Sequence, residues 1–346
     1  MDVLPPHARL TVDTAALAAN WRTFAKASGA AVCGAAIKAD GYGLGARAVM
    51  TALAAAGCTE YFVAHWHEVA ALGQLPAGIR VAVLHGVAGG ELAAAVASPA
   101  VPVLVTAAQV TAWRPTGKSC DVMVDTGMNR LGISAEEAVS GLLDGLRIDT
   151  LHSHLACSEE PRHPMNERQR AGFAALVPHI SARRYALANS GGIGLGPGYC
   201  FGLTRPGIGL YGSGPGPNGA QLATVAGISA RILQLRDVPA GHSIGYGATA
   251  TTRRPTRLAI TALGYADGYP RALSNRGEAL VDGVRCPLLG RVSMDLTAFD
   301  VTDAPPLAEG GWINIGFDLP AAAAATGRSQ YELLTGLGHR YQRIYT

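Results

Sequence analysis

The sequence predicts an α/β protein that consists of a (β/α)8 barrel of the TIM type over residues 11–215 and a C-terminal mainly-β domain over residues 220–346. In the first part, eight short apolar runs typical of buried parallel strands alternate with alanine-rich helical stretches. No Gly-x-Gly-x-x-Gly turn follows these runs, which favours the barrel over the alternative of an open, doubly wound sheet. After a turn-rich linker at residues 213–219, strand runs separated by regular turns indicate a β domain.

Each element is predicted from its hydrophobic period and from the turn residues beside it. The barrel strands are predicted at Ala31–Lys38, Tyr61–Ala64, Arg80–Leu84, Val101–Val105, Asp121–Asp125, Ile148–Ser153, Tyr185–Ala188 and Gly207–Tyr211. The helices of this part are predicted at Thr14–Ala27, Ala46–Ala56, His67–Gln74, Ala107–Trp113, Ala135–Leu143 and Asn166–His179. The second domain is predicted to contain strands at Ala223–Leu235, Leu258–Leu263, Glu278–Val281, Asp295–Val301, Trp312–Gly316 and Arg340–Tyr345. Its two short helices are predicted at Pro320–Ala325 and Ser329–Leu337, and residues 1–10 are candidates to pack with it.

Composition excludes several classes of protein. Gly, Pro or charge interrupts every apolar run before it reaches the length that spans a membrane, and the first ten residues lack the features of a signal peptide. We therefore expect a cytoplasmic protein. The net charge of +3 is small and scattered, so we expect no nucleic-acid partner. The six cysteines stand singly, without CxxC or Cys/His spacing, which predicts free thiols in a reducing compartment and no metal site.

Lysine is rare in this chain, and one lysine has an unusual position. Of the 28 basic residues, only Lys26, Lys38 and Lys118 are lysines. Lys38 closes the first predicted strand, and active sites lie at the carboxyl ends of barrel strands. Burial there predicts a lowered pKa or a covalently engaged amine. In the alternative interpretation, the stem packs while the ammonium group reaches water at the barrel mouth. The position of Lys38 alone leaves both interpretations open.

Eight motifs, in order along residues 30–300, resemble those of the alanine racemases. The first, AAIKADGYGLGA, surrounds Lys38 and Tyr42. The others are VDTGMNRLGIS (124–134), SHLACSEEP (153–161), ALANSGG (186–192), TRPGIGLYGSGP (204–215), IGYGATAT (244–251), LGYADGYPRAL (263–273) and GRVSMD (290–295).

The resemblance implies an enzyme that depends on pyridoxal 5′-phosphate and interconverts L- and D-alanine, supplying D-alanine for cell-wall peptidoglycan. Inverting a stereocentre needs one acid/base group on each face of the substrate. By resemblance, Lys38 carries the cofactor and serves one face. Tyr246 serves the other from the partner chain of a homodimer with shared active sites.

The resemblance also implies which residues bind the cofactor and the substrate. The cofactor-binding residues are Lys38, Tyr42, His154, Asn189, Ser190, Arg205, Gly207 and Ile208. Arg130 is implied to bind the substrate carboxylate, Met294 of the partner chain to contact the substrate, and Tyr265 to form an entry gate. Arg205 is implied to face the ring nitrogen of the cofactor. As a permanent donor it leaves that nitrogen unprotonated, which suits a short-lived carbanion.

The sequence departs from the family at two positions. Met123 stands where many alanine racemases carry a carbamylated lysine, so the sequence does not identify the group that pairs with Arg130 and orients it. Near the C-terminus, His339 or Tyr341 aligns with a tyrosine that contacts the phosphate. The alternative functions are a racemase of another small amino acid such as serine, and a lyase or decarboxylase of the same cofactor and fold.

Overall fold

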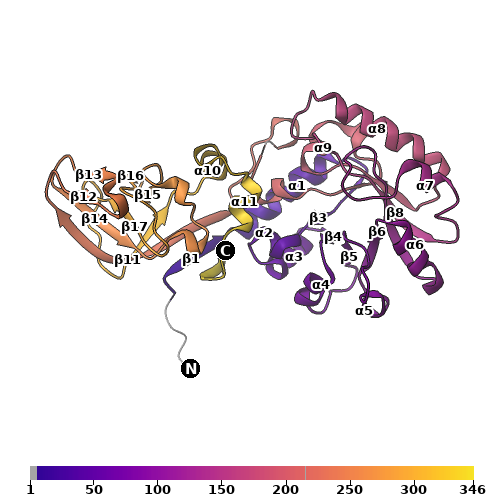
Figure 1. Cartoon of the computed structure of the whole chain (residues 1–346), viewed down its shortest axis with the longest axis horizontal. Coiled ribbons are helices and arrows are strands. Elements are labelled where there is room, and N and C mark those ends of the chain that lie inside the picture. Colours follow the sequence, from indigo (N-terminus) through magenta and orange to yellow (C-terminus); the bar gives the residue numbers. More distant parts are fainter. Residues whose placement is uncertain (1–5, 215) are drawn as a thin grey trace. The chain divides into compact units, whose positions relative to one another are not determined.

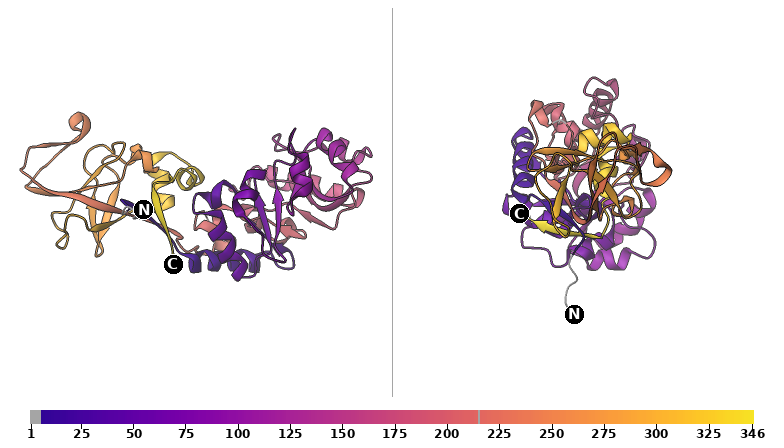
Figure 2. Two further views of the ribbon diagram at one scale, coloured as in Figure 1. Left: turned by 90° about the horizontal axis from the view of Figure 1, so that it is seen from below. Right: turned by 90° about the vertical axis from the view of Figure 1, so that its left-hand side faces the viewer.

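A computed structural model describes residues 6–214 and 216–346 of the chain. The chain divides into two compact units: Ala15–Ala223, and the N-terminal segment up to Thr14 together with Thr224–Thr346. Figure 1 shows the first unit, in indigo to pink, as alternating helices and strands; the second, in orange and yellow apart from its indigo N-terminal strand, consists mainly of strands. Figure 2 shows both units from two further directions.

The first unit is built on a parallel sheet whose strands follow one another in chain order from β3 to β9. All neighbouring pairs are parallel. The strands are β3 (Ala35–Ala36), β4 (Glu60–Val63), β5 (Arg80–Val83), β6 (Val101–Leu104), β7 (Ser119–Met123), β8 (Arg147–His152) and β9 (Arg184–Ala186). Most of their residues are buried on both faces, as a parallel sheet covered by helices requires.

A further strand closes this sheet into a barrel. β10 (Leu203–Thr204) pairs in parallel with β2 (Val32–Cys33), which lies just before β3. On its other side the β10 segment follows β9, since the Arg205 amide donates to the carbonyl of Ala188 (2.8 Å). The predicted barrel is thus confirmed, with β2 and β3 sharing one of eight strand positions.

One predicted strand is wrong. Gly207–Tyr211 is not the eighth strand: Ile208–Tyr211 forms a 3-10 turn, η4, and the strand lies upstream at Leu203–Thr204. A short apolar run satisfies the pattern of a strand and that of a tight buried turn equally well. The difference matters because it places residues 207 and 208 beyond the end of the strand, at the barrel mouth.

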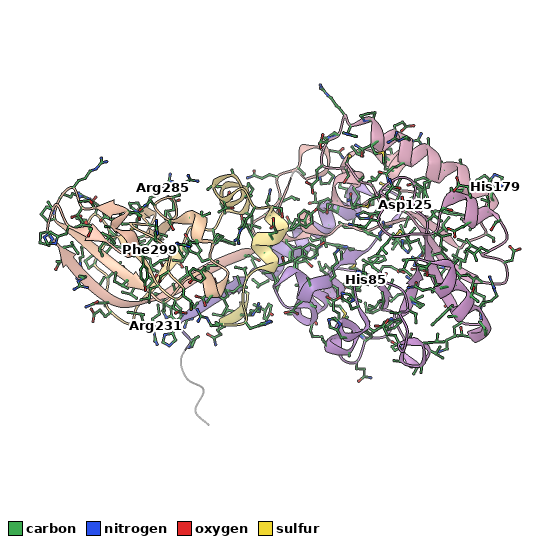
Figure 3. All side chains as sticks on the ribbon, in the orientation of Figure 1. His85, Asp125, His179, Arg231, Arg285 and Phe299 are labelled. Atoms are coloured by element: carbon green, nitrogen blue, oxygen red, sulfur yellow. The ribbon has the colours of Figure 1, made fainter. Side chains whose placement is uncertain are left out.

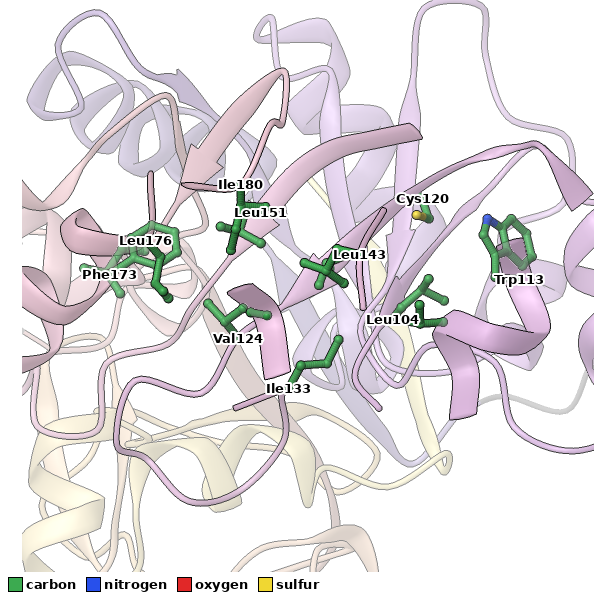
Figure 4. Packing of buried hydrophobic residues seen from close by; sticks show 14 of the residues in the cluster. Leu104, Trp113, Cys120, Val124, Ile133, Leu143, Leu151, Phe173, Leu176 and Ile180 are labelled. Atoms are coloured by element: carbon green, nitrogen blue, oxygen red, sulfur yellow. The ribbon is translucent and has the colours of Figure 1, made fainter. Parts of the chain in front are cut away.

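Helices connect the strands and cover the barrel (Figure 1). They are α1 (Thr14–Ala27), α2 (Lys38–Tyr42), α3 (Ala46–Ala55), α4 (Trp66–Leu72), α5 (Leu92–Ala97), α6 (Ala107–Trp113), α7 (Ala135–Val139), α8 (Pro164–Leu176) and α9 (Ser190–Gly194). Figure 4 shows part of the core between strands and helices, where Leu104 and Leu151 pack in one cluster with Trp113 of α6 and Phe173 of α8. These contacts hold the strands that carry the polar residues described below.

The second unit is a mainly antiparallel β structure. Its central sheet has the order β16-β15-β18-β11-β1-β19, and β14 pairs with β11 and β17. The strands are β1 (Ala8–Val12), β11 (Ala226–Val238), β12 (Ser243–Ile244), β13 (Ala250–Thr251), β14 (Thr256–Thr261), β15 (Glu278–Val281), β16 (Val284–Pro287), β17 (Thr297–Asp300), β18 (Trp312–Ile315) and β19 (Tyr341–Tyr345). Two short helices, α10 (Leu319–Thr326) and α11 (Gln330–Thr335), precede the last strand. The predicted C-terminal β domain is confirmed, and β1 lies in its sheet. Within the described residues, no helix combines the length and apolar character needed to cross a membrane.

Candidate active site

Lys38 lies at the carboxyl end of β3, where the strand gives way to the short turn α2. Burial lowers the pKa of its amine from the ordinary 10.5, and the charge of Arg130 lowers it further. Lys26 is exposed at the last turn of α1, and Lys118 immediately precedes β7, at the opposite end of the barrel. Of the three lysines, only Lys38 therefore combines a position at the barrel mouth with a tendency toward the neutral, nucleophilic amine.

The turn after Lys38 is left-handed and is held by specific contacts. Ala39, Asp40 and Tyr42 have φ values of 52°, 53° and 56°, and each such L-residue costs about 1–2 kcal/mol. The Glu68 carboxylate accepts the Ala39 amide (2.6 Å), and the Asp40 carboxylate accepts the amide of Ala46 (2.8 Å). These bonds hold the backbone that aims Lys38 and carries Tyr42.

Three loops form a cradle of small residues and backbone amides. The Ser190 hydroxyl oxygen accepts the amides of Gly207 (2.9 Å) and Gly209 (3.3 Å), which leaves its own proton available to a ligand. Asn189 caps α9 by accepting the Gly192 amide (2.9 Å). A Cβ at Gly207 would lie 2.4 Å from the Tyr42 hydroxyl oxygen, so only glycine admits this approach. A hydroxyl proton presented among small residues in this way suits a phosphate group.

Arg205 follows β10 and is buried. Its guanidinium donates to the Ser153 carbonyl (2.6 Å) and lies 3.1 Å from Nδ1 of His152 and 3.5 Å from Nδ1 of His154. Burial lowers the pKa of Arg205 to about 10, so it stays charged near neutral pH. Burial and then the charge of Arg205 lower the pKa of His154 to about 3, which leaves His154 neutral. A neutral imidazole with Nδ1 toward a guanidinium keeps its proton on Nε2, where it can donate a hydrogen bond.

Arg130 lies in the loop after β7, and its guanidinium is not held by the nearby carboxylate. Asp125, labelled in Figure 3, accepts the backbone amides of Gly127 (2.7 Å), Met128 (2.8 Å) and Arg130 (3.1 Å). Among the described residues, no ion pair includes Arg130, whose side chain is exposed. Met123, buried at the end of β7, brings no charge.

The other predicted site residues belong to the second unit. Tyr246 is 73% exposed, Met294 54% and Tyr265 45%. Tyr265 and Met294 are neighbours, because the Tyr265 amide donates to the Ser293 carbonyl (3.0 Å). Tyr341 is buried inside this unit, whereas His339 is exposed.

Several polar residues near this site were missed by sequence reasoning. His152 and Asp121 are fully buried on β8 and β7, and the His152 ring lies against Arg205. His65 follows β4 and His85, labelled in Figure 3, follows β5; their Nδ1 atoms lie 3.1 Å apart. For Asp121 and His152 the available signal was a polar residue within an apolar strand, which is costly to bury without a partner. Within residues 6–214 and 216–346, no three His, Cys, Asp or Glu side chains form a candidate metal site.

The residues at the barrel mouth fit pyridoxal 5′-phosphate. Lys38 supplies an amine of lowered pKa for its aldehyde, the Ser190 hydroxyl supplies a donor for its phosphate, and Arg205 supplies a buried cation. The Gly207 backbone lies so close to Tyr42 that a Cβ has no room there, a constraint that an ordinary turn of small residues does not impose.

Comparison with known proteins identifies two matching family models. The N-terminal domain of alanine racemase matches residues 12–215, and the C-terminal domain matches residues 225–345. A catabolic alanine racemase of Agrobacterium fabrum is 44% identical, with 97% of this chain and 91% of the relative covered. The alanine racemase of Acidiphilium cryptum is 43% identical, with 98% of both covered. A crystal structure from Bartonella henselae, an alanine racemase with covalently bound pyridoxal phosphate, has a TM-score of 0.90 and 35% identity, and covers 99% of this chain and 100% of that one.

Proposed function

The chain belongs to the alanine racemase family, which depends on pyridoxal 5′-phosphate, and we propose that it interconverts L- and D-alanine at the mouth of its barrel. The observation that carries the proposal is the meeting of three features at one end of the barrel. These are the amine of Lys38, the donors around Ser190 and the buried charge of Arg205. When bound, the cofactor withdraws electrons from the substrate α-carbon and so makes its proton acidic.

Lys38 provides the acid/base group for one face of the substrate. Its burial and the nearby charge of Arg130 favour the neutral amine, which can take the α-proton from its own face while the group on the opposite face donates one. The left-handed turn after Lys38, held by Glu68, fixes the direction from which the amine acts. Glu68 and Tyr42 are positioning residues in this scheme, because they act through the Lys38 backbone and through the phosphate cradle.

Tyr246 of a second copy provides the group for the opposite face. Its side chain is 73% exposed, and Met294 and Tyr265 of the same unit are also largely exposed. Exposed aromatic and methionine side chains are typical of surfaces that a partner covers. A homodimer in which each site takes Tyr246 and Met294 from the partner explains this exposure. His154, held neutral with its Nδ1 toward Arg205, carries its proton on Nε2 and donates the hydrogen bond that tunes the tyrosine hydroxyl.

The substrate carboxylate binds Arg130, whose exposed guanidinium has no carboxylate partner among the described ion pairs. A planar guanidinium binds a carboxylate through two parallel hydrogen bonds and so orients the α-carbon. Tyr265 narrows the entrance and favours a substrate as small as alanine. The six thiols, all free, are consistent with a reducing compartment, which supports the cytoplasm as the location.

Complementation tests the shared site. Lys38→Ala chains and Tyr246→Phe chains are each expected to be inactive as homodimers, and Lys38→Ala also to lose the visible absorbance of the bound cofactor. After subunit exchange, mixed dimers carry one site with both groups intact, so part of the activity returns. Lys26→Ala, at an exposed helix end, is the matched control and keeps activity and absorbance.

The proposal fails if Lys38→Ala keeps the cofactor absorbance, or if demonstrated heterodimers show no activity. The substrate is tested with alanine, serine and other small amino acids, each followed for loss of optical activity and for decarboxylated or eliminated products. Alanine racemisation as the fastest reaction supports the proposal. A faster reaction with serine, or a lyase or decarboxylase product, contradicts it.

A further inference from the structure

A chain of buried polar groups runs through the barrel interior and ends at Arg205. Arg80 of β5 donates to the Asp121 carboxylate of β7 (Nη2 to Oδ1, 2.6 Å). Oδ2 of the same carboxylate lies 3.0 Å from Nε2 of His152 on β8. Nδ1 of His152 lies 3.1 Å from Nη1 of Arg205, after β10. Asp121 and His152 are fully buried, so these contacts provide the hydrogen bonds that water would provide at the surface.

The donors around Asp121 determine the state of its carboxylate. Oδ1 also accepts the Thr150 amide (3.0 Å), so both oxygens have partners. Burial alone raises the pKa of Asp121, but the hydrogen bond from His152 and the charge of Arg80 outweigh it and hold the pKa below its ordinary value. Asp121 is therefore a charged acceptor for His152.

The guanidinium of Arg205 determines the tautomer of His152. Arginine has donors only, so Nδ1 of His152 must present its lone pair to Arg205. The single ring proton then lies on Nε2, where Asp121 accepts it. Burial lowers the pKa of His152 to about 4, so the ring does not gain a second proton near neutral pH. The hydrogen bond from Nε2 to the Asp121 carboxylate makes the ring more electron-rich, so Nδ1 becomes a stronger acceptor for Arg205.

Arg205 has no carboxylate of its own. None of the ion pairs among the described residues includes it, and its other contacts are the carbonyls of Ser153 (2.6 Å) and Leu187 (3.4 Å) and the ring of His154. A buried cation without a counter-ion tends to lose its charge or its position. The His152–Asp121 pair supplies the missing partner through a neutral ring.

We propose that His152 and Asp121 are positioning residues that hold Arg205 as a charged hydrogen-bond donor toward the ring nitrogen of the cofactor. The inference rests on the proposed function for the identity of that cofactor. It assigns to the polar interior of the barrel a role in the reaction in addition to packing.

Asp121→Asn tests the chain of contacts because its outcome follows from the donors around residue 121. Arg80 and the Thr150 amide both need an acceptor, so the amide oxygen takes the place of Oδ1 and the NH2 group faces His152. His152 must then accept at Nε2, and its proton moves to Nδ1. The N–H at Nδ1 then faces the N–H donors of Arg205, and because two donors cannot form a hydrogen bond, the contact between His152 and Arg205 is lost.

The first measurement uses the apoprotein labelled with 15N-histidine. The His152 ring is assigned by its disappearance in His152→Gln. We expect the wild-type ring to be protonated at Nε2 and the Asp121→Asn ring at Nδ1. A wild-type ring protonated at Nδ1, or a tautomer that Asp121→Asn does not change, overturns the inference.

The second measurement is racemisation by the holoenzyme. Losing a buried hydrogen bond to a charged group predicts a fall in kcat of about 10- to 100-fold for Asp121→Asn, with little change in KM. Glu60→Gln is the matched control. Glu60 is also buried and pairs with Arg80 (3.2 Å) and Arg184 (2.8 Å), but it does not contact His152. It removes the same charge from the same interior, and we expect its kcat to stay close to wild type. An equal loss in both variants overturns the inference.

A second pair of variants decides the question if Asp121→Asn does not fold. His152→Gln retains an acceptor for Arg205, whereas His152→Leu retains none. We expect kcat of the folded Gln variant to exceed that of the Leu variant by about tenfold; equal values overturn the inference. A wild-type enzyme that does not racemise alanine overturns the proposed function instead, while the apoprotein tautomer still reports on the His152–Asp121 pair.

Discussion

Gly207→Ala probes the closest approach in the phosphate cradle. A Cβ built on Gly207 lies 2.4 Å from the Tyr42 hydroxyl oxygen and 3.3 Å from the ring carbon that bears it. Tyr42 would have to retreat by about 1 Å to restore ordinary van der Waals contact. The phosphate cradle therefore has no room for even one additional methyl group unless Tyr42 moves.

Tyr42 has little freedom to move. It is 5% exposed and stacks on Tyr211, with 4.6 Å between the ring centroids. Tyr211 is itself fully buried, and its hydroxyl donates to the Ala36 carbonyl (2.9 Å). Overpacking such a site costs about 1–3 kcal/mol. In a unit of this size that corresponds to a fall in Tm of about 2 to 12 °C.

The assay is thermal unfolding of the apoprotein, followed by titration with pyridoxal 5′-phosphate. We expect Gly207→Ala to melt lower and to bind the cofactor about tenfold more weakly, because Tyr42 and the residue 207 amide are both displaced. Gly172→Ala, in α8, is the control: nothing lies within 4 Å of its added Cβ, and we expect it to stabilise the protein by about 1 kcal/mol. A Gly207→Ala variant with wild-type Tm and cofactor affinity would refute this reasoning.

Three further predictions concern strain, charge and pH. Ala39→Gly relieves a left-handed residue at an exposed position and should raise stability by about 1 kcal/mol in urea unfolding, whereas Ala48→Gly, within α3, should lower it by about as much. Because Met123 brings no charge and Asp125 is occupied by loop amides, a small anion such as chloride should sit beside Arg130. Bromide-soaked crystals should then show an anomalous peak there, and KM should depend on halide; a direct carboxylate contact with neither effect contradicts this. Burial lowers the pKa of His152 from 6.5 to about 4, so between these pH values the unfolded chain binds a proton that the folded chain does not. The free energy of unfolding is therefore unaffected by His152 above pH 6.5 and falls by about 1.4 kcal/mol per pH unit as the pH drops from 6.5 toward 4. In urea unfolding, His152→Gln should lack this pH-dependent fall. Parallel pH profiles for the two proteins would contradict the prediction.

The local pattern of the sequence predicted the two-domain architecture, and the resemblance to a family supplied the candidate site residues. Lys38 was unusual as a lysine that closes an apolar strand, whereas Gly207 became a candidate only through its place in a family motif. The β domain followed from its strand and turn spacing. The eighth strand was placed too late because an apolar run of a few residues has the same pattern in a strand and in a 3-10 turn.

Tertiary structure alone decided which residues act together inside the barrel. Asp121, His152 and Arg205 are separated in sequence by 31 and 53 residues, and they meet only because β7, β8 and β10 turn them toward the same interior. In the sequence His154, within a family motif, drew attention, while His152, two positions earlier, looked like part of a strand. The sequence did not reveal the role of His152 because a single polar residue in an apolar strand indicates that a hydrogen-bond partner is needed, but not which residue that partner is. The identity of that partner depends on strand register and barrel closure, which local sequence does not encode.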